Sequence, residues 1–294
     1  MSKKKSESVL VVKSNSLIEA SYRLTLREQR IVLYMASMIQ QDDEDFKPIK
    51  IEIDDFTKII GLTGYPKYDE IRETVIQLLK RYLVINTEKT QLHIGWLSSA
   101  EYFKGQGYVE LCFDPKLKPY LLQLKERFTK YYFQNVIQLS HSYSIRFYEL
   151  LKQYENIGWR TLQVEELKKI LGIYENEYAL YANFKLKVLE PVKKELQAKA
   201  EQGNLDLSFE YEEIKLSRKV DKIKFIILKS KPNKTNHQEH PEQAQAQSII
   251  PEQAQAQAQD LLESLTSLKV SKPKALEILQ QYPSEQIKRN IDYA

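Results

Sequence analysis

The sequence predicts an α+β protein with two tandem winged-helix domains, each a helix-turn-helix followed by a β-hairpin wing. Three observations predict this fold: a ten-residue pattern that occurs twice, the same order of elements around both copies, and a sharp change of composition after Lys231. The expected organisation, from the N-terminus, is a flexible arm at 1–15, domain 1 at 16–128, domain 2 at 129–231, a low-complexity Gln/Ala-rich linker at 232–259 and a small helical tail module at 260–294.

The repeated pattern reads apolar, two acids, apolar, polar, Lys, two apolar, Gly, apolar, and it covers residues 53–62 and 164–173. The acids of each copy stand where a helix would begin, and there they oppose the helix dipole and accept hydrogen bonds from free amides. Gly61 and Gly172 stand where that helix would end, because glycine tolerates positive φ. The offset between the copies, 111 residues, has the size of a domain.

The elements around the two copies follow one order: helix, short strand, helix, tight turn, longer helix, β-hairpin. A single helix-turn-helix pattern is weak support for the fold, whereas two copies in the same order are much stronger support. We expect Pro191 to bend the longer helix of domain 2. The predicted helices lie at 25–40, 54–60, 68–84, 143–154, 165–171 and 181–199, and the predicted strands at 49–53, 92–96, 108–113, 131–139, 160–164, 205–211 and 222–228.

Positive charge is concentrated in the part of the chain that is predicted to fold. The net charge of the chain is +4, and residues 1–231 hold 38 Lys and Arg against 32 Asp and Glu. Residues 232–294 hold 6 Lys and Arg against 8 Asp and Glu. Their Gln/Ala-rich part has too few branched or aromatic side chains to form a core. The single Cys112 excludes a disulfide scaffold and fits a reducing cytoplasm, where we expect the protein to reside. No apolar run is long enough to predict a transmembrane helix.

The longer helix of domain 2 is the predicted DNA-reading element. The second helix of a helix-turn-helix can enter the major groove, where Asn can bond adenine and Lys can bond guanine. With Phe184 at the centre of the buried face, ideal geometry puts Lys185 nearer the buried side than the other polar candidates. The hairpin tip adds basic residues suited to phosphate contacts, although any one lysine could instead belong to an ordinary solvated surface. The candidates in domain 2 are Asn183, Lys185, Lys187, Lys193, Lys194, Lys215, Arg218, Lys219 and Lys222.

The longer helix of domain 1 presents a second set of candidates on its polar side. Arg72 and Lys80 could track phosphates, or this copy could serve as a dimerisation surface in which a turn at 102–108 carries the contact. The aromatic-rich stretch 131–154 could stack on bases, but we favour its packing into the core of the domain. The candidates in domain 1 are Lys67, Tyr68, Arg72 and Lys80.

Known catalytic patterns are missing from the sequence. The chain has no Gly-Lys-Ser/Thr, and so no phosphate-binding loop of the nucleotide hydrolases. Its four histidines contain no His-x-His pair, and two of them fall in the predicted linker, where a fixed ligand geometry is not expected. We therefore expect no catalytic residues, no metal site, no cofactor and no enzymatic activity.

Several stretches occur in an order that is typical of one known family. They are 15–20, 24–25, 28–31, 113–115, 119–121, 128–131, 142–152, 167–168 and 171–173. The most specific of them begins Ser-Tyr-Ser-Ile-Arg-Phe-Tyr-Glu-Leu-Leu at Ser142. Over about residues 10–230 the chain resembles the RepB-like plasmid replication initiators, the iteron-binding family of theta replication.

The resemblance implies two winged-helix domains and a function in plasmid replication. Monomers of such proteins bind iterons, which are repeated sites at the origin, and help to open the duplex. Dimers, formed largely through the first domain, often bind an inverted operator and repress their own gene. The recognition helix of the family carries basic residues after a Phe, a place that Phe184, Lys185 and Lys187 occupy in this chain. The linker and the tail module lie outside the shared pattern.

Three hypotheses for the function follow. The first is a replication initiator without catalytic activity, which binds double-stranded plasmid origin DNA, exchanges between monomer and homodimer, and represses its own gene. The second is a winged-helix transcriptional repressor with no origin function, and the third is a scaffold whose winged helices bind protein. Under the first hypothesis the tail module at 260–294 is expected to contact a host helicase or helicase loader, because it is an apolar-patterned unit on a tether. No membrane partner is expected.

Overall fold

The structure, a computed structural model, describes residues 9–231 except 41, 63–67, 88, 104, 126 and 175, together with residue 265. Residues 1–8 of the predicted arm, the predicted linker and, apart from residue 265, the predicted tail module lie outside the described residues. Within the described part of the chain, no helix is long and apolar enough to cross a membrane.

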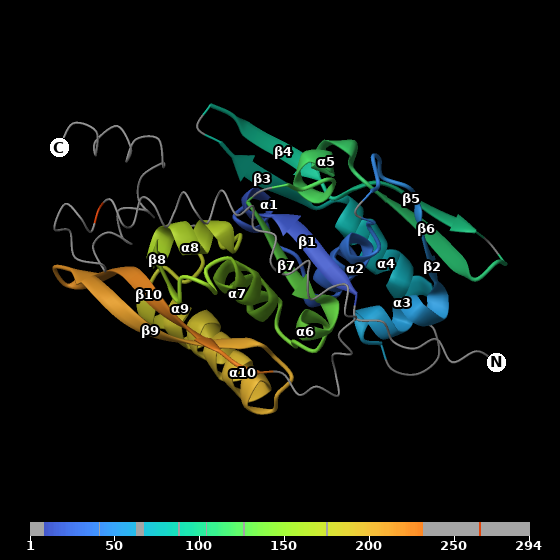
Figure 1. The fold of residues 1–294 in the computed structure, drawn as a ribbon. Helices are drawn as coiled ribbons and strands as arrows, with labels where there is room; N and C mark the ends of the chain where they lie inside the picture. The colour runs from blue at the N-terminus through green and yellow to red at the C-terminus, as the bar shows by residue number, and fades with distance from the viewer. Residues whose placement is uncertain are drawn as a thin grey trace. The chain divides into compact units, whose positions relative to one another are not determined.

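The first strand of the chain pairs with the segment that connects the two domains. β1 (Leu10–Ser14) runs antiparallel to β7 (Phe128–Tyr132), with Leu10 opposite Tyr132 and Ser14 opposite Phe128 (Figure 1). The flexible arm predicted for 1–15 is therefore too long, because residues 10–14 are held in a sheet and Lys13 is buried. The short helix α1 (Asn15–Ile18) follows, capped by the Ser14 side chain.

Domain 1 is organised around α2 (Leu26–Ser37), which begins in a capping box: the Glu28 amide donates to the Thr25 hydroxyl, and the Thr25 amide donates to the Glu28 carboxylate. α3 (Ile53–Ile60) ends at Gly61, and the φ of 75° at this glycine confirms the predicted left-handed helix end. The other elements of the domain are β2 (Ile49–Glu52), α4 (Tyr68–Leu79), β3 (Tyr82–Asn86), β4 (Gln91–Gly95), β5 (Leu97–Phe103) and β6 (Tyr108–Phe113).

The hairpin of domain 1 differs from the predicted one. β6 lies between β2 and β5 in an antiparallel sheet, whereas the strand at 92–96, which was expected to pair with it, belongs to β4 and pairs with β3. The helix predicted for 68–84 ends at Leu79, because Leu83 and Ile85 are buried alternately with more exposed neighbours, as in a strand. A second hairpin, β3–β4, thus precedes the hairpin β5–β6.

The connection between the domains is part strand and part helix. It passes through the 3-10 turn η1 (Pro115–Leu117), α5 (Lys118–Leu121), β7 and α6 (Phe133–Ile137). The strand predicted for 131–139 is wrong beyond Tyr132, because α6 begins at the next residue and buries Val136. The Phe133 amide donates to the Val9 carbonyl at the end of the β1–β7 pairing.

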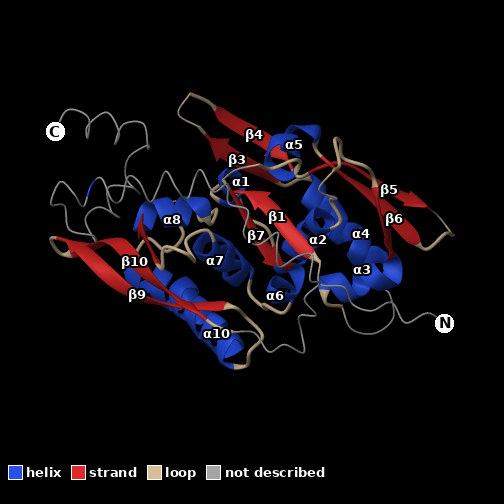
Figure 2. Cartoon of the chain, viewed as in Figure 1, coloured by secondary structure: helices blue, strands red, loops and turns tan. Residues whose placement is uncertain are grey.

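Domain 2 repeats the order of domain 1 without the extra hairpin. Its three-stranded sheet has the order β8-β10-β9, and the long hairpin β9–β10 lies along α10 (Figure 2). The loop predicted between the hairpin strands is mostly strand, because Leu216 already pairs with Lys219 and leaves a two-residue turn. The elements are α7 (Ser142–Lys152), β8 (Trp159–Gln163), α8 (Val164–Ile170), α9 (Tyr181–Phe184), the π-helical turn η2 (Lys185–Leu189), α10 (Glu190–Glu201), β9 (Leu207–Leu216) and β10 (Lys219–Lys229).

Aromatic side chains of the stretch 131–154 are part of the core, as we favoured from the sequence. Tyr131, Phe147 and Tyr148 are all at most 2% exposed. The Phe147 ring lies 5.9 Å from that of Phe209 and 5.8 Å from that of Phe225, so α7 packs against both strands of the long hairpin. These rings are not available to stack on bases.

Candidate nucleic-acid interface

The candidate DNA-reading helix runs without a break through α9, η2 and α10. Phe184, Val188, Val192 and Leu196 are at most 1% exposed and hold one face of this helix against the domain. The π-helical turn ends at Leu189, one residue before Glu190 and two before Pro191, which cannot donate the backbone hydrogen bond that an α-helix needs. The structure thus has a wider turn just before the proline at which a bend was predicted.

Three of the predicted DNA-binding residues on this helix are exposed to solvent: Asn183, Lys187 and Lys194. They lie away from the buried face, as the helical geometry predicted. Asn183 and Lys187 are one turn apart, so their side chains share a face near the N-terminal end of the helix. This is the part of a recognition helix that approaches base edges in the major groove.

Two other predicted residues already have partners within the domain. The Lys185 ammonium lies 2.8 Å from the Glu213 carboxylate, and the Lys193 ammonium lies 2.5 Å from Glu210. Both glutamates belong to β9, so these pairs join the helix to its own wing. The geometry supports Lys185 and Lys193 as residues that hold the wing against the helix, and leaves Lys187 and Lys194 as the more accessible cations.

The helix–wing ion pairs stay charged around neutral pH. The hydrogen bond to Glu213 raises the pKa of Lys185, and the same bond lowers the pKa of Glu213. The hydrogen bond from Lys193 lowers the pKa of Glu210. Burial, together with the hydrogen bond that the Tyr181 hydroxyl donates to Glu213, raises the pKa of this tyrosine. None of these shifts moves a titration toward pH 7.

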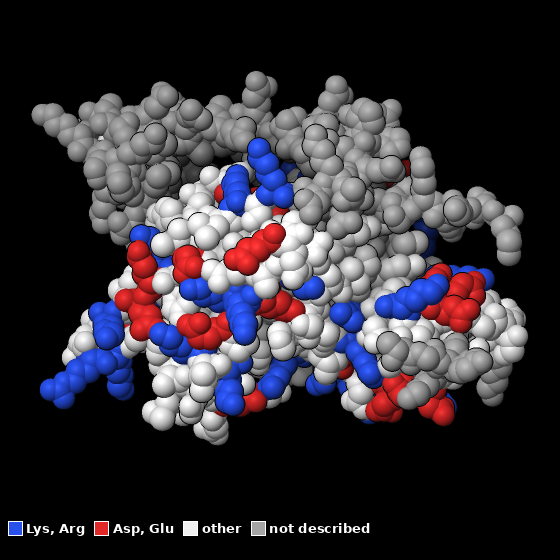
Figure 3. Space-filling model, turned by 90° about the horizontal axis from the view of Figure 1, so that it is seen from below, with Lys and Arg blue, Asp and Glu red and all other residues white. Residues whose placement is uncertain are grey.

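The tip of the wing carries four basic residues and one acid, Asp221. Lys215, Arg218 and Lys219 are exposed, and Lys222 is half-buried. Figure 3 views the molecule from the side of α10 and the hairpin: blue and red side chains alternate over the body of domain 2, and blue alone marks the projecting tip. The side chains of Arg218 and Lys219 form no hydrogen bond or ion pair with any described residue, so they are suited to phosphate contacts.

The corresponding helix of domain 1, α4, has a different surface. Tyr68, Arg72 and Lys80 are exposed as predicted, while Lys67 lies outside the described residues. Acids dominate its first turns, however, and one of them, Glu70, lies 3.4 Å from Arg27. Burial raises the pKa of Tyr102 on the neighbouring strand β5 to about 12, although the charge of Arg72 acts in the opposite direction.

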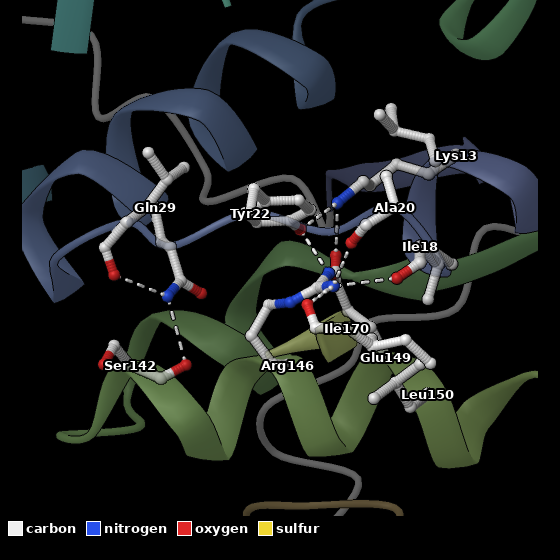
Figure 4. A network of polar contacts seen from close by, with 12 residues as sticks. Lys13, Ile18, Ala20, Tyr22, Gln29, Ser142, Arg146, Glu149, Leu150 and Ile170 are labelled. Atoms are coloured by element: carbon white, nitrogen blue, oxygen red, sulfur yellow. Dashed lines mark hydrogen bonds and ion pairs between the residues drawn. The ribbon is translucent and has the colours of Figure 1, made fainter. Parts of the chain in front are cut away.

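A buried polar network joins the two domains, and sequence reasoning missed it. Its centre is Arg146 of α7, whose guanidinium donates to the Ile18 and Ala20 carbonyls at 2.9 Å and to the Ile170 carbonyl at 3.2 Å (Figure 4). It also donates to the Tyr22 hydroxyl. Residues 18–22 precede α2 of domain 1, whereas Ile170 ends α8 of domain 2. One side chain therefore connects the helix-turn-helix of domain 2 to the start of domain 1.

Ion pairs complete this network. Glu149 lies 2.8 Å from the Lys13 ammonium and 3.4 Å from the Arg146 guanidinium, and all three side chains are at most 2% exposed. Burial on its own would raise the pKa of Glu149, but Lys13 and Arg146 outweigh it and the pKa is lowered. The carboxylate is therefore ionised and its charge is compensated on two sides, which a buried charge requires.

Close backbone contact reinforces the junction at Gly172. This glycine has a φ of +65°, and a Cβ at this position would lie 2.6 Å from the Tyr22 carbonyl atoms. Arg23 donates to both oxygens of Glu177 at 2.8 and 2.7 Å, and the Ser21 hydroxyl donates to the Lys169 carbonyl at 2.5 Å. The segment that leads into α9 thus packs against residues 21–23, and these contacts fix where the reading helix begins relative to domain 1.

Comparisons with known proteins agree with this architecture. The family model described as "Initiator Replication protein, WH1" matches residues 10–152, and the model "Initiator Rep protein, WH2" matches residues 163–227. An uncharacterized 27.6 kDa protein of Escherichia coli is 24% identical over 214 residues, which are 68% of this chain and 89% of that protein. The crystal structure of Pi initiator protein in complex with iteron DNA is 20% identical, covers 77% of this chain and 99% of its own, and has a TM-score of 0.60. The two tandem winged-helix domains predicted from the sequence are confirmed.

Proposed function

The chain belongs to the initiator replication protein family, since the WH1 and WH2 models together match more than half of it, and from this premise we propose that it initiates plasmid replication by binding iterons. The resemblance to plasmid replication initiators stated from the sequence is thereby confirmed. A solved structure with this fold, that of Pi initiator protein, is in complex with iteron DNA, which supports duplex DNA as the ligand here.

The observation that carries the proposal is the surface of domain 2. Its reading helix exposes Asn183 and Lys187 on one face, and its wing ends in Arg218 and Lys219. The first pair suits adenine and guanine edges in the major groove, and the second pair suits phosphates of the adjacent backbone. Sequence preference then comes from the helix, while the salt-sensitive part of the affinity comes from the wing and the basic residues of domain 1.

The test begins with the DNA that flanks the gene. We expect direct repeats of about 20 bp, near two turns of duplex at roughly 10 bp each. The full chain should bind one repeat more tightly than a random duplex of the same length, with an affinity that falls steeply as salt rises. Equal affinity for both duplexes, or binding without salt dependence, would contradict the proposal.

A repressor without origin function is the alternative that uses the same surface. The two functions are separated by supplying the protein in trans to a plasmid that carries only the candidate origin. Maintenance of that plasmid supports initiation, and its loss supports repression alone. A scaffold that binds only protein would show neither sequence-specific DNA binding nor plasmid maintenance.

We propose further that a homodimer formed through domain 1 represses the gene of this protein. The acids in the first turn of α4, Asp69 and Glu70, favour a protein contact at that end of the helix, whereas Arg72 and Lys80 further along stay available to phosphates. The dimer is expected to bind an inverted operator upstream of the gene, and the monomer to bind the direct repeats. Analytical ultracentrifugation of the chain with each DNA measures the stoichiometry, and one protomer on the inverted site would contradict this assignment.

The tail module stays a predicted docking unit for a host helicase or helicase loader, in a protein that acts in the cytoplasm without catalytic activity of its own. Deletion of 232–294 is expected to preserve binding to the repeat and to impair replication. Full replication by the truncated chain would contradict this part of the proposal.

A further inference from the structure

One apolar side chain interrupts the polar face of the reading helix. Leu186 is 64% exposed, and it lies between Asn183 and Lys187 in the sequence. Within 181–201, a stretch that is described throughout, it is the one large apolar residue with such exposure. Packing in the core of the domain therefore does not account for an apolar residue at this position.

Leu186 lies within the π-helical turn, between the buried Phe184 and the buried Val188. Buried positions that recur every three to four residues leave the positions between them facing solvent. Val188 and Leu189 are both at most 1% exposed, whereas Leu186 and Lys187 are both exposed. Leu186 consequently shares the face of Asn183 and Lys187, three residues after the first of them.

The chemistry of the major groove offers one apolar target to such a side chain. Base edges there present hydrogen-bond donors and acceptors, and in addition the 5-methyl group of thymine. The neighbours of Leu186 on this face are the Asn183 amide and the Lys187 ammonium, which suit base edges and phosphates. A lysine is disfavoured at the core of a protein–protein interface. A duplex with a thymine between two polar contacts fits all three side chains.

We infer that Leu186 is a specificity-determining residue that selects thymine by contact with its 5-methyl group. The inference rests on the proposed function and deepens it, because it names a base feature of the site. Asn183 and Lys187 contribute hydrogen bonds to the flanking bases, and the leucine excludes water from the thymine methyl. Cytosine, which has no methyl group at this position, is rejected in the same place, and 5-methylcytosine restores the apolar contact.

The experiment uses the full chain and the direct repeat to which it binds. Each thymine of the repeat is replaced singly by uracil, which removes the methyl group and keeps every hydrogen-bonding atom. We expect one such replacement to weaken binding about fourfold, the effect of burying one methyl group. The Leu186→Ala variant is expected to bind the thymine and uracil repeats equally, and Leu186→Met, which keeps an apolar chain, to retain most of the preference.

Two control variants separate this contact from general effects. Leu228→Ala, an equal truncation of a leucine that is 41% exposed on β10, should keep the full preference for thymine over uracil. Asn183→Ala should weaken binding to both repeats by the same factor and so keep their ratio. Thermal unfolding of each variant checks that the fold is retained.

Three results would overturn the inference. In the first, no single uracil replacement changes the affinity. In the second, Leu186→Ala retains the preference for thymine. In the third, Leu186→Ala changes self-association in ultracentrifugation while the ratio of affinities is unaltered, which would assign the leucine to a protein interface. Absence of any preference for the repeat over random duplex would instead overturn the proposed function, and this inference with it.

Discussion

The second helices of the two winged-helix domains occupy the same place in the order of elements, but their charges are opposite. α4 carries three acids and a single arginine, whereas the helix formed by α9, η2 and α10 carries five lysines and three glutamates. The apolar spacing that builds the fold is common to both copies. The polar face is not constrained by that spacing, and there the two copies have diverged.

The hairpins extend this difference. In domain 1 the sheet places Glu101 of β5 directly opposite Glu110 of β6, an arrangement of like charges that Lys50 of β2 offsets from the other side. In domain 2 the tip of β9–β10 presents Arg218 and Lys219 to solvent. The repeated pattern therefore predicts where a DNA-reading helix and its wing can lie. The charge on the polar face of each helix then determines which of the two copies can bind DNA bases.

The largest expected effect concerns the junction that holds the two helices in one arrangement. Arg146→Met removes the buried guanidinium that donates to three backbone carbonyls, and it leaves Lys13 as the remaining donor to the Tyr22 hydroxyl. We expect a loss of about 3–5 kcal/mol in the free energy of unfolding. Urea denaturation measures the change. Arg218→Met, the same substitution at an exposed position, should stay within about 0.5 kcal/mol of the parent. A change below about 1 kcal/mol for Arg146→Met would show that the network does not support the fold.

The next effect compares the two helices directly. Lys187→Ala combined with Arg218→Ala removes a base contact and a phosphate contact, and we expect about a 100-fold loss of affinity for the repeat and a much smaller loss for random duplex. Arg72→Ala combined with Lys80→Ala should weaken both duplexes equally, by about tenfold, and reduce the slope of log affinity against log salt. Equal behaviour of the two double variants in fluorescence anisotropy would contradict the division of labour between the domains.

A third, smaller effect tests whether α4 lies near DNA at all. Asp69→Asn combined with Glu73→Gln removes two exposed negative charges from this helix. Because Arg72 and Lys80 are assigned to phosphates, we expect affinity for any duplex to rise several-fold at low salt, without a change in sequence preference. An unchanged affinity would restrict DNA contact to domain 2 and contradict the phosphate contacts assigned to Arg72 and Lys80.

The smallest effect concerns pH. The pKa values of Glu213 and Glu210 are lowered below 4.5, so both helix–wing pairs lose their contribution as pH falls through the lowered values. The pKa of Lys185 is raised above 10.5, so its pair with Glu213 also loses its contribution as pH rises through the raised value. DNA affinity should therefore vary little between pH 6 and 9. Glu213→Gln frees Lys185 and should raise affinity about twofold to threefold. A marked drop in affinity near pH 7 would point to a titrating group outside these pairs.

Local signals in the sequence predicted the helices of both repeats and the exposed side of the reading helix. Gly61 and the apolar face of α3 mark a helix and its end within a few residues, so no distant information is needed. The junction between α4 and β3 was missed because Tyr82 follows Leu79 at helical spacing and no Gly or Pro separates them. Local spacing alone could not show where that helix stops.

The parts of the site that sequence reasoning missed depend on partners from distant segments. Lys185 and Lys193 looked like free cations, and their acids come from a strand that begins only after the helix has ended. Arg146, three residues before Glu149 on a helix, has the spacing of an ordinary surface pair. Its burial follows from residues 18–22, which lie more than a hundred positions away.

The pairing of β1 with β7 has a consequence for how the chain is made. Proteins are synthesised from the N-terminus, so β1 leaves the ribosome long before β7, the strand that completes its hydrogen bonds. Residues 10–14 must therefore remain unpaired until the interdomain connection has left the exit tunnel, and a fragment that stops before Phe128 would carry an open strand edge. Domain 1 therefore completes its β1–β7 pairing only after the segment that connects it to domain 2 has been synthesised.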